Sequence, residues 1–184
     1  MARIGIVGGG PAGLSAGLFL AKNGQEAVVY DTDDTAMHYA HLFNYLGIES
    51  MDGDAYVEAA REQAADHGVD HREAEVTSVR DADDGFVVAT DDDESTYDYV
   101  VFATGQSRTL AADIGCETTE AGEIDVDRSG RTSVDGAYAA GWATRKQQIQ
   151  TVISAGDGAA AALDVLSTEV EPGFHDFDTP SDAE

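Results

Sequence analysis

Apolar and polar positions along the chain follow two periods, one typical of strands and one typical of helices. The sequence opens on an apolar run at residues 4–7, and Leu14 and Leu18 then follow at helical spacing. The run predicts a buried strand and the spacing predicts a helix, which ends at Asn23 because Gly24 can adopt positive φ. The chain therefore begins with a strand, a glycine-rich turn and a helix.

The same periods continue to the end of the chain. The predicted strands cover residues 26–30, 75–79, 86–90, 97–103 and 137–141, and the predicted helices cover residues 54–67 and 154–166. Residues 32–53 and 106–123 show little periodicity and are predicted to be irregular. This order predicts one α/β domain over residues 1–168, with a small antiparallel insert at 72–97 and an acidic tail at 169–184.

The turn after the first strand carries the strongest chemical signal. Gly8, Gly10 and Gly13 have the G-x-G-x-x-G spacing of dinucleotide-binding turns, and Pro11 takes a first-turn position that tolerates its missing N–H. The first glycine permits the tight turn, the second lets the backbone approach a pyrophosphate, and the third lets helix and strand pack closely. The start of the helix then offers free N–H groups and a partial positive charge to phosphates.

The second predicted strand leads to an acid, Asp31, which lies 31 − 13 = 18 positions after Gly13. An acid about 20 residues past the glycines is placed to bond a ribose hydroxyl, and it disfavours a 2′-phosphorylated ribose. The alternative is a solvated acid that caps a turn, because Asp33 and Asp34 are close by. We favour the ribose role because a strand precedes the acid.

The charge balance indicates which partners and which salt conditions suit the protein. The 184 residues include 36 Asp and Glu against 10 Lys and Arg, for a formal net charge of −26. Such a domain repels itself in dilute buffer and needs screening by salt, and nucleic acids and anionic membranes are poor partners for it. The acidic, lysine-poor composition resembles that of cytosolic proteins from extreme halophiles. An acidic protein of an ordinary cytosol is the alternative.

A single cysteine, Cys116, excludes an intrachain disulfide framework and any C-x-x-C redox pair. We expect a structural thiol at this position rather than a nucleophile. No signal peptide is visible before the first strand, and no apolar run approaches the roughly 20 residues of a membrane helix. These observations predict a soluble, cytoplasmic protein.

Four stretches occur in the order that is typical of one family. They are the glycine turn at 8–13, the Val-Val-Phe-Ala-Thr-Gly run at 100–105, the Gly-Ala-Tyr-Ala-Ala-Gly run at 136–141 and the segment 150–156. Together they resemble the FAD domain of the thioredoxin-reductase branch of the pyridine nucleotide-disulfide oxidoreductases, from residue 2 to about 166. The resemblance implies a three-layer FAD/NAD(P)-binding, Rossmann-like fold with a central parallel sheet and a small antiparallel β insert.

The resemblance also implies which residues of this chain contact FAD. The glycine turn would hold the pyrophosphate, the acid after the second strand the adenosine ribose, and the backbone at residue 76 the adenine. The Asn-Tyr-Leu-Gly stretch at 44–47 looks like the family's Glu-Asn-Phe/Trp-Pro-Gly stretch from its Asn onward, so Asn44 would lie beside the flavin. The start of the last helix would face the isoalloxazine ring. The implied cofactor-binding residues are Gly8, Gly10, Pro11, Ala12, Gly13, Asp31, Asn44, Val76, Ala103, Thr104, Gly105, Gly141, Trp142, Gln150 and Thr151. No catalytic residue and no metal ligand is assigned.

Three departures from the family pattern shape the predicted activity. First, the family places a second glycine-rich NADPH domain before the last strand, but here only about 30 residues separate Gly105 from Gly136. Second, that domain carries the family's redox-active C-x-x-C, which this sequence lacks. The third departure is Trp142, which stands where the family has an Asp that bonds the ribityl chain. The expected protein is a single-domain flavoprotein that performs no dithiol–disulfide exchange and receives electrons from an external donor or partner protein.

The predicted opening beside the flavin is lined by His38, His41, Tyr45, Trp142, Arg145 and Lys146. The last two form a rare basic pair, which either steers a negative substrate or only lies near a helix or loop end. The two histidines could share one face of a helical turn, but no third metal ligand is evident. A non-catalytic flavin or adenine-nucleotide module and a Rossmann dehydrogenase are the alternative functions. The resemblance also implies a homodimer.

Overall fold

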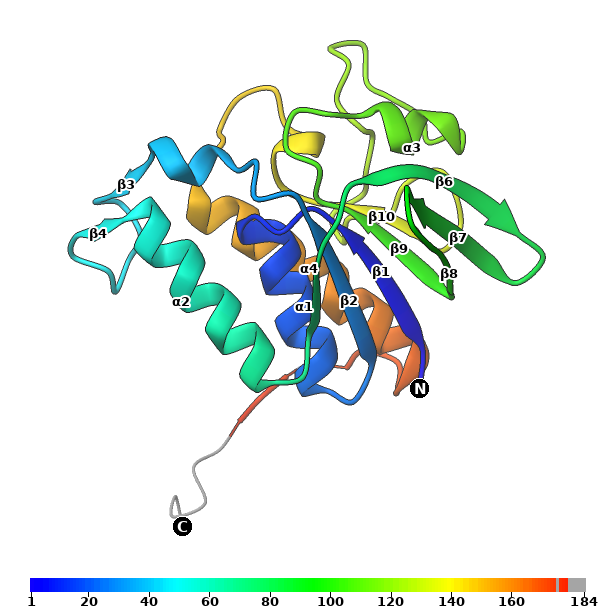
Figure 1. The fold of residues 1–184 in the computed structure, drawn as a ribbon, viewed down its shortest axis with the longest axis horizontal. Coiled ribbons are helices and arrows are strands. Elements are labelled where there is room, and N and C mark those ends of the chain that lie inside the picture. The colour runs from blue at the N-terminus through cyan, green and yellow to red at the C-terminus, as the bar shows by residue number, and fades with distance from the viewer. Residues whose placement is uncertain (175, 179–184) are drawn as a thin grey trace.

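Residues 1–174 and 176–178 are described by the computed structural model, and they form three layers (Figure 1). The middle layer is a five-stranded sheet in the order β10-β9-β1-β2-β5, in which every neighbouring pair is parallel. Its strands are β1 (Arg3–Val7), β2 (Glu26–Asp31), β5 (Asp70–Glu73), β9 (Tyr99–Phe102) and β10 (Ala137–Ala139). The predicted α/β fold with a central parallel sheet is therefore confirmed.

Helices cover one face of the central sheet. α1 (Pro11–Lys22) and α4 (Thr151–Glu169) pack side by side on it, and α2 (Gly53–Asp66) packs against α1. Strand side chains alternate between the two faces, so every second residue reaches this helical core. The core includes Ile4, Ile6, Val29 and Val101 from the strands and Leu14, Leu20, Ala161 and Val165 from the helices.

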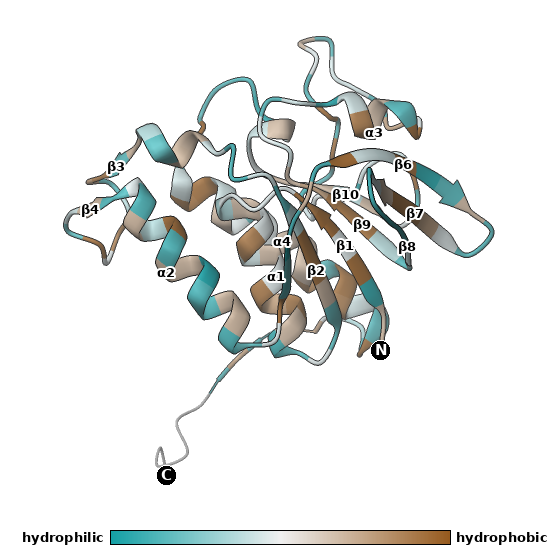
Figure 2. Ribbon diagram, viewed as in Figure 1, coloured by the Kyte–Doolittle hydropathy of each residue, from teal (hydrophilic) through white to brown (hydrophobic). Residues whose placement is uncertain are grey.

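A three-stranded antiparallel sheet covers the other face. Its strands are β6 (Val76–Ala82), β7 (Gly85–Thr90) and β8 (Glu94–Tyr97). The core between the two sheets includes Val28, Val100 and Phe102 from the central sheet and Val79, Phe86 and Val88 from the antiparallel sheet. Because β1, β2, β9 and β10 are buried on both faces, they are apolar along most of their length, as Figure 2 shows.

The segment after β2 is more regular than the sequence predicts. Residues 32–53 contain the elements η1 (Ala36–Tyr39), β3 (His41–Leu42) and β4 (Met51–Asp52). The Thr35 hydroxyl caps η1 by accepting a hydrogen bond from the Met37 N–H. Met37 and Leu42 then form a small core with Val57 of α2. This segment therefore has its own buried anchor.

Two strand boundaries differ from the prediction. β5, at the edge of the sheet, is absent from the prediction because its residues Asp-His-Arg-Glu are all polar. Residues 72 and 73, which are predicted to belong to the antiparallel insert, are part of β5. The predicted strand 97–103 is divided at Asp98, whose N–H donates to the Arg3 carbonyl and whose carboxylate accepts from the Arg3 N–H. β8 ends before this residue and β9 begins after it.

The last part of the chain adds α3 (Thr109–Asp113), which packs against β6, and completes the helical layer with α4. The short elements α3 and η2 (Gly141–Thr144) precede α4, which is longer at both ends than the predicted helix 154–166. Phe174 packs against the helical core, and Lys22 Nζ lies 2.7 Å from the Asp176 carboxylate. Residue 175 and residues 179–184 of the predicted tail lie outside the described residues.

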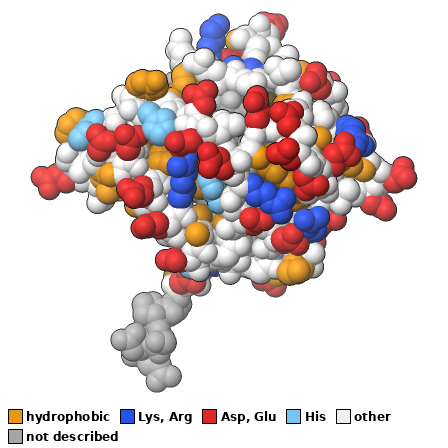
Figure 3. Space-filling view, in the orientation of Figure 1, with side chains coloured by type: hydrophobic (Ala, Val, Ile, Leu, Met, Phe, Trp, Pro, Cys, Tyr) orange, Lys and Arg blue, Asp and Glu red, His pale blue; other side chains and the backbone are white. Residues whose placement is uncertain are grey.

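Acidic side chains are spread over the visible face of the molecule rather than gathered in one patch, as Figure 3 shows. Of the helices in the described ranges, none has both the length and the apolar character that crossing a bilayer requires.

The substitution Gly158→Ala tests the contact between α4 and α1. A Cβ at Gly158 would collide with the backbone carbonyl of Ala12, which cannot rotate away as a side chain can. We expect this overpacking to lower the free energy of unfolding by about 1–3 kcal/mol, measured by chemical denaturation. Gly156→Ala on the same helix is the control, because nothing lies within 4 Å of a Cβ there. Equal stability of the two variants would contradict the packing.

Candidate functional site

The carboxyl ends of central strands and the amino ends of two helices meet at one edge of the molecule (Figure 1). β1 leads into α1, and β10 leads through η2 into α4. Gly10 precedes α1 and Gln150 precedes α4, neither makes a side-chain capping hydrogen bond, and the first turn of each helix holds no acid. The first N–H groups of both helices are therefore left for another acceptor.

Close backbone contacts fix the glycine turn between β1 and α1. Gly8 has φ +111°, a region that favours glycine. A Cβ on Gly8 would collide with the carbonyl of Ala103, and a Cβ on Gly13 would collide with the carbonyl of Gly8. Gly10 differs, because a Cβ there would meet only the Thr35 hydroxyl, at 3.5 Å. The turn thus brings β1, α1 and the end of β9 together and leaves space at its second glycine.

The start of α4 reaches the same turn through small residues. Pro11 and Ala12 form the first turn of α1, and the Ala12 carbonyl lies against Gly158. Gly141, at φ +70°, begins η2 so close to α1 that a Cβ would lie 2.9 Å from the Ala12 Cβ. The two uncapped helix starts are therefore held next to each other.

Segments 106 residues apart in sequence meet at the start of α4. Asn44 Nδ2 donates to Gln150 Oε1 at 2.8 Å, and the Thr151 hydroxyl lies 3.3 Å from Met37 Sδ. Asn44, Gln150 and Thr151 are the residues that the sequence predicts on the isoalloxazine side. The structure brings them together.

Asp31, at the end of β2, is one of two acids that are buried in the described part of the chain. Its Oδ2 lies 2.6 Å from Arg61 Nη2 and 3.2 Å from His71 Nε2, and its Oδ1 accepts from the Asp33 N–H at 2.9 Å. Burial alone would raise the pKa of Asp31, but these hydrogen bonds outweigh burial and hold the pKa below its ordinary value. The carboxylate also lies over Gly9, where a Cβ would collide with it.

The surroundings of Asp31 bear on both interpretations of this acid. Its Oδ1 caps the turn at Asp33, but the side chain is only 6 % exposed and lies over the glycine turn, so it is not a solvated cap. Its contact with a ribose stays a prediction. Its partners Arg61 and His71 are absent from the prediction. They come from α2 and β5, and no local spacing in the sequence connects them with Asp31.

Val76 lies on the same side of the site as Asp31. The last residue of β5, Glu73, is paired with Asp31, and the Ala74 N–H donates to the Asp31 carbonyl at 3.1 Å. Val76 follows two residues later, as the first residue of β6. The residues predicted at the adenosine end therefore lie near each other.

The loop after β9 connects the glycine turn with η2. Thr104 follows Ala103, its hydroxyl donates to the Ser107 carbonyl at 2.5 Å, and Gly105 has φ +58°. Arg108 then donates to the carbonyls of Gln106 and Trp142, while its Nε is buried and has no hydrogen-bond partner among the described residues. Trp142 is half-buried. Arg108 thus links the loop after β9 to η2, the two segments that are predicted to contact the dinucleotide.

Several side chains predicted to line the opening are engaged within the protein. Arg145 makes two hydrogen bonds of 2.7 Å with Asp157 of α4, and this pairing raises the pKa of Arg145. His41 Nε2 lies 3.0 Å from the Ser50 hydroxyl, and Tyr45 packs near Tyr56 of α2. Arg145 therefore has a structural partner, and a steering role for the basic pair stays a prediction.

His38 joins η1 to the start of α2. Its Nδ1 lies 2.5 Å from Asp54 Oδ1, and its Nε2 lies 2.7 Å from the Asp33 carbonyl. Both ring nitrogens face acceptors, so only the doubly protonated ring satisfies both. The Asp54 carboxylate, followed by the Asp33 carbonyl, therefore raises the pKa of His38. Within residues 1–174 and 176–178, no group of three or more His, Cys, Asp or Glu could hold a metal ion.

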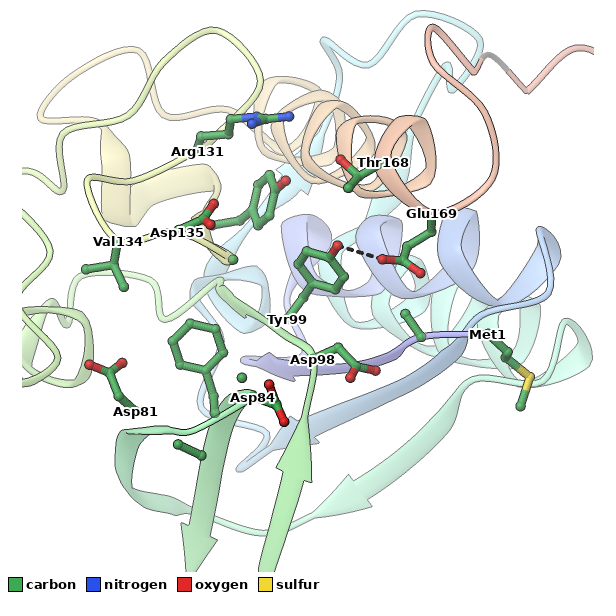
Figure 4. A pocket seen from close by; sticks show the side chains of 16 residues that line it. Met1, Asp81, Asp84, Asp98, Tyr99, Arg131, Val134, Asp135, Thr168 and Glu169 are labelled. Atoms are coloured by element: carbon green, nitrogen blue, oxygen red, sulfur yellow. Dashed lines mark hydrogen bonds between the residues drawn. The ribbon is translucent and has the colours of Figure 1, made fainter.

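A hollow of about 760 Å³ lies at the opposite, amino-terminal edge of the central sheet (Figure 4). Acids surround it, and the Tyr99 hydroxyl donates to Glu169 at 2.7 Å across it. The acids are Asp81, Asp84, Asp98, Asp135 and Glu169. These acids outnumber Arg131, which also lines the hollow and is paired with Asp164, so the hollow is poorly suited to phosphate groups.

A glycine turn between a parallel strand and a helix, with an acid at the end of the next strand, defines a dinucleotide-binding α/β domain. Comparison with known families gives the assignment. The pyridine nucleotide-disulphide oxidoreductase family matches residues 48–159, and the FAD binding domain family matches residues 1–69. The chain belongs to the pyridine nucleotide-disulphide oxidoreductase family.

Solved structures of thioredoxin reductases share the fold. A thioredoxin reductase from Gloeobacter violaceus has a TM-score of 0.86 at 18 % identity, over 97 % of this chain and 98 % of that chain. The atypical thioredoxin reductase TRi from Desulfovibrio vulgaris Hildenborough has a TM-score of 0.85 at 18 % identity, over 94 % of this chain and 100 % of that chain. The enzyme from T. acidophilum has a TM-score of 0.84 at 19 % identity, over 92 % and 99 % of the two chains. No curated protein sequence matches the chain.

The family matches identify FAD as the cofactor, as the resemblance in sequence implies. The structure fits its dinucleotide part: the turn has space at Gly10, α1 begins without a cap, and Asp31 lies beside the turn. The flavin part of FAD fits less well, because the ring of Trp142 offers no acceptor for a ribityl hydroxyl.

The raised pKa of His38 predicts a pH dependence of stability. A histidine whose folded pKa lies above its unfolded value of about 6.5 stabilises the fold fully below that pH and loses this effect as pH rises through the folded pKa. We therefore expect the stability difference between the native protein and His38→Gln to be larger at pH 6 than at pH 9, measured by denaturant unfolding. A difference that does not change with pH would contradict the ion pair with Asp54.

Proposed function

We propose that this chain is a single-domain, FAD-dependent oxidoreductase that receives electrons from an external donor and performs no dithiol–disulfide exchange itself. The observation that carries the proposal is the meeting of two uncapped helix N-termini beside a glycine turn with space at Gly10. Free N–H groups and helix dipoles stabilise anionic groups at such a place. FAD, when bound, supplies the acceptance and release of electrons.

Each end of the proposed site has a matching group in this chain. The N–H groups at the start of α1 would hold the pyrophosphate. Asp31 would accept a hydrogen bond from the adenosine ribose, while Arg61 and His71 hold its carboxylate in place. Gln150, held by Asn44, and the N-terminus of α4 would stabilise negative charge at the flavin end.

The state of Cys116 supports the absence of dithiol exchange. It is the single cysteine in the sequence, it is buried, and its Sγ lies 3.4 Å from the Thr132 hydroxyl. Burial raises the pKa of the thiol, which lowers the fraction of the reactive thiolate at neutral pH. One buried thiol without a second cysteine cannot cycle between dithiol and disulfide.

The segment between β9 and β10 supports an external electron source. It contains the short helix α3 and irregular loops, with no second strand, glycine turn and helix. The family resemblance places the nicotinamide domain at this point of the chain. We therefore infer that a nicotinamide nucleotide or a protein donor reaches the site from outside.

Trp142 favours a second candidate function, a module that binds flavin without turnover. Its ring stands where the family resemblance implies an acidic acceptor, and its carbonyl is already bonded to Arg108. Such a module would hold FAD but would not be reduced by nicotinamide nucleotides or protein donors.

An absorbance spectrum in multimolar KCl tests both candidates. Bands near 370 and 450 nm are expected from bound, oxidised FAD, and titration with NADH or NADPH is expected to bleach the band near 450 nm. FAD that dithionite reduces, but that neither a nicotinamide nucleotide nor a protein donor reduces, would favour the module. A protein that remains colourless after addition of FAD would contradict both functions.

The substitution Gly10→Ala separates folding from cofactor binding. A Cβ at Gly10 meets no backbone atom of this chain, so we expect unfolding of the FAD-free protein to change by less than about 1 kcal/mol. The same Cβ would occupy the approach to the pyrophosphate, so the Kd for FAD is expected to rise at least about tenfold by fluorescence titration. Gly13→Ala is the contrast, because its Cβ collides with the Gly8 carbonyl and lowers stability. An unchanged Kd in Gly10→Ala would argue against this turn as the pyrophosphate site.

A further inference from the structure

Three large apolar side chains within residues 39–46 are exposed to water. Tyr39, the last residue of η1, is 94 % exposed, and Phe43 and Leu46, in the loop between β3 and β4, are 73 % and 96 % exposed. Single exposed apolar residues are ordinary, but three within eight residues form a local group of the kind that marks an interaction site. We call these three side chains the hairpin patch.

The hairpin patch is held in a defined conformation. Leu42 is buried in the same small core as Val57 of α2. The Ile48 N–H donates to the Tyr45 carbonyl at 2.8 Å and closes a tight turn that carries Leu46 near its tip. The apolar side chains are thus exposed by an anchored hairpin, and a partner would find them already in place.

The hairpin patch adjoins the flavin end of the proposed site. Asn44 lies between Phe43 and Tyr45 in sequence and bonds Gln150 at the start of α4. A hollow of about 500 Å³, lined by residues 43–49, lies on the same hairpin. A protein that covers Phe43 would therefore lie next to the end of the site where electrons enter or leave.

The rim of the hairpin patch is acidic. Glu49 lines the hollow together with Phe43 and Leu46. The Asp52 carboxylate lies 3.8 Å from His41, whose ring is 4.4 Å from the ring of Phe43. In Figure 3, acidic, histidine and hydrophobic side chains lie close together at the end of the molecule that carries β3 and β4.

The charges around the hairpin patch select the kind of partner. No Lys or Arg occurs from residue 23 to residue 60 of the sequence. A two-fold dimer through this hairpin would bring the acids of both copies close together, with no Lys or Arg from residues 23–60 between them. The homodimer that the family resemblance implies would therefore use another face. A partner with Lys or Arg around an apolar contact matches both the patch and its rim.

We propose that the hairpin patch is the docking surface for an electron-transfer protein whose apolar contact is ringed by Lys and Arg. The proposal rests on the proposed function, because the patch adjoins the proposed flavin end, and it adds the chemistry of the partner. Apolar side chains at the centre supply most of the affinity, and the acidic rim guides the encounter and sets the orientation.

The test uses ferric cytochrome c, a small basic electron-transfer protein, as the probe. Its Kd for the full chain is measured by isothermal titration calorimetry, at the lowest KCl concentration at which circular dichroism shows the native fold. The double variant Phe43→Ala/Leu46→Ala keeps the net charge and is expected to raise the Kd at least about tenfold. Val170→Ala, which truncates a half-exposed side chain just after α4, is the control and is expected to leave the Kd unchanged.

Two further measurements separate docking from FAD binding and from self-association. First, the titration is repeated with FAD-free protein, where the loss of affinity in the double variant is expected to persist. Second, the FAD content of the double variant, purified with its cofactor, is expected to match that of the native protein. Binding of cytochrome c that tolerates the double substitution, or no binding at all, would overturn the proposal. A change from dimer to monomer in the double variant, measured by light scattering, would also overturn it because the patch would then be a self-interface.

Discussion

Contact between backbones, without intervening side chains, fixes the relative positions of β1, α1, β9 and α4. Gly8, Gly13 and Gly158 each lie where a Cβ would collide with a carbonyl oxygen of the main chain. Backbone contacts of this kind leave little freedom for one element to move against another. The uncapped starts of α1 and α4 are therefore fixed side by side before any ligand arrives, which reduces the ordering cost of binding.

The phosphate contacts proposed for this acidic protein come from the main chain rather than from basic side chains. Seven of the ten Lys and Arg residues form ion pairs with acids of the described chain: Arg3, Lys22, Arg61, Arg72, Arg80, Arg131 and Arg145. Exposed pairs of this kind stabilise a fold by about 0–1 kcal/mol each. Arg61 has a larger role, because it faces the buried carboxylate of Asp31. The helix N-termini, together with Arg108, Arg128 and Lys146, which form none of these ion pairs, remain as sources of positive potential for an anionic cofactor.

How much the sequence predicts depends on whether a feature is local. The glycine turn, α1 and the apolar central strands are predicted because the signal for each of them, a glycine spacing or a hydrophobic period, lies within one short stretch of sequence. The polar edge strand β5 carries no hydrophobic period, and Arg61 and His71 reach Asp31 only through the tertiary fold. The contact between Asn44 and Gln150 is implied by the family resemblance and by no spacing in this chain. The pairing of Arg145 with Asp157 is also tertiary, and no spacing in the sequence indicates it.

Hydrogen exchange with and without FAD tests the central claim most directly, because it reports on the backbone amides that would hold the cofactor. The account predicts that FAD slows exchange in the first turns of both α1 and α4, and that amides in the β6–β8 sheet far from the site change little. FAD that binds and leaves the first turn of α1 unprotected would contradict the account, because the glycine turn would then not hold the pyrophosphate.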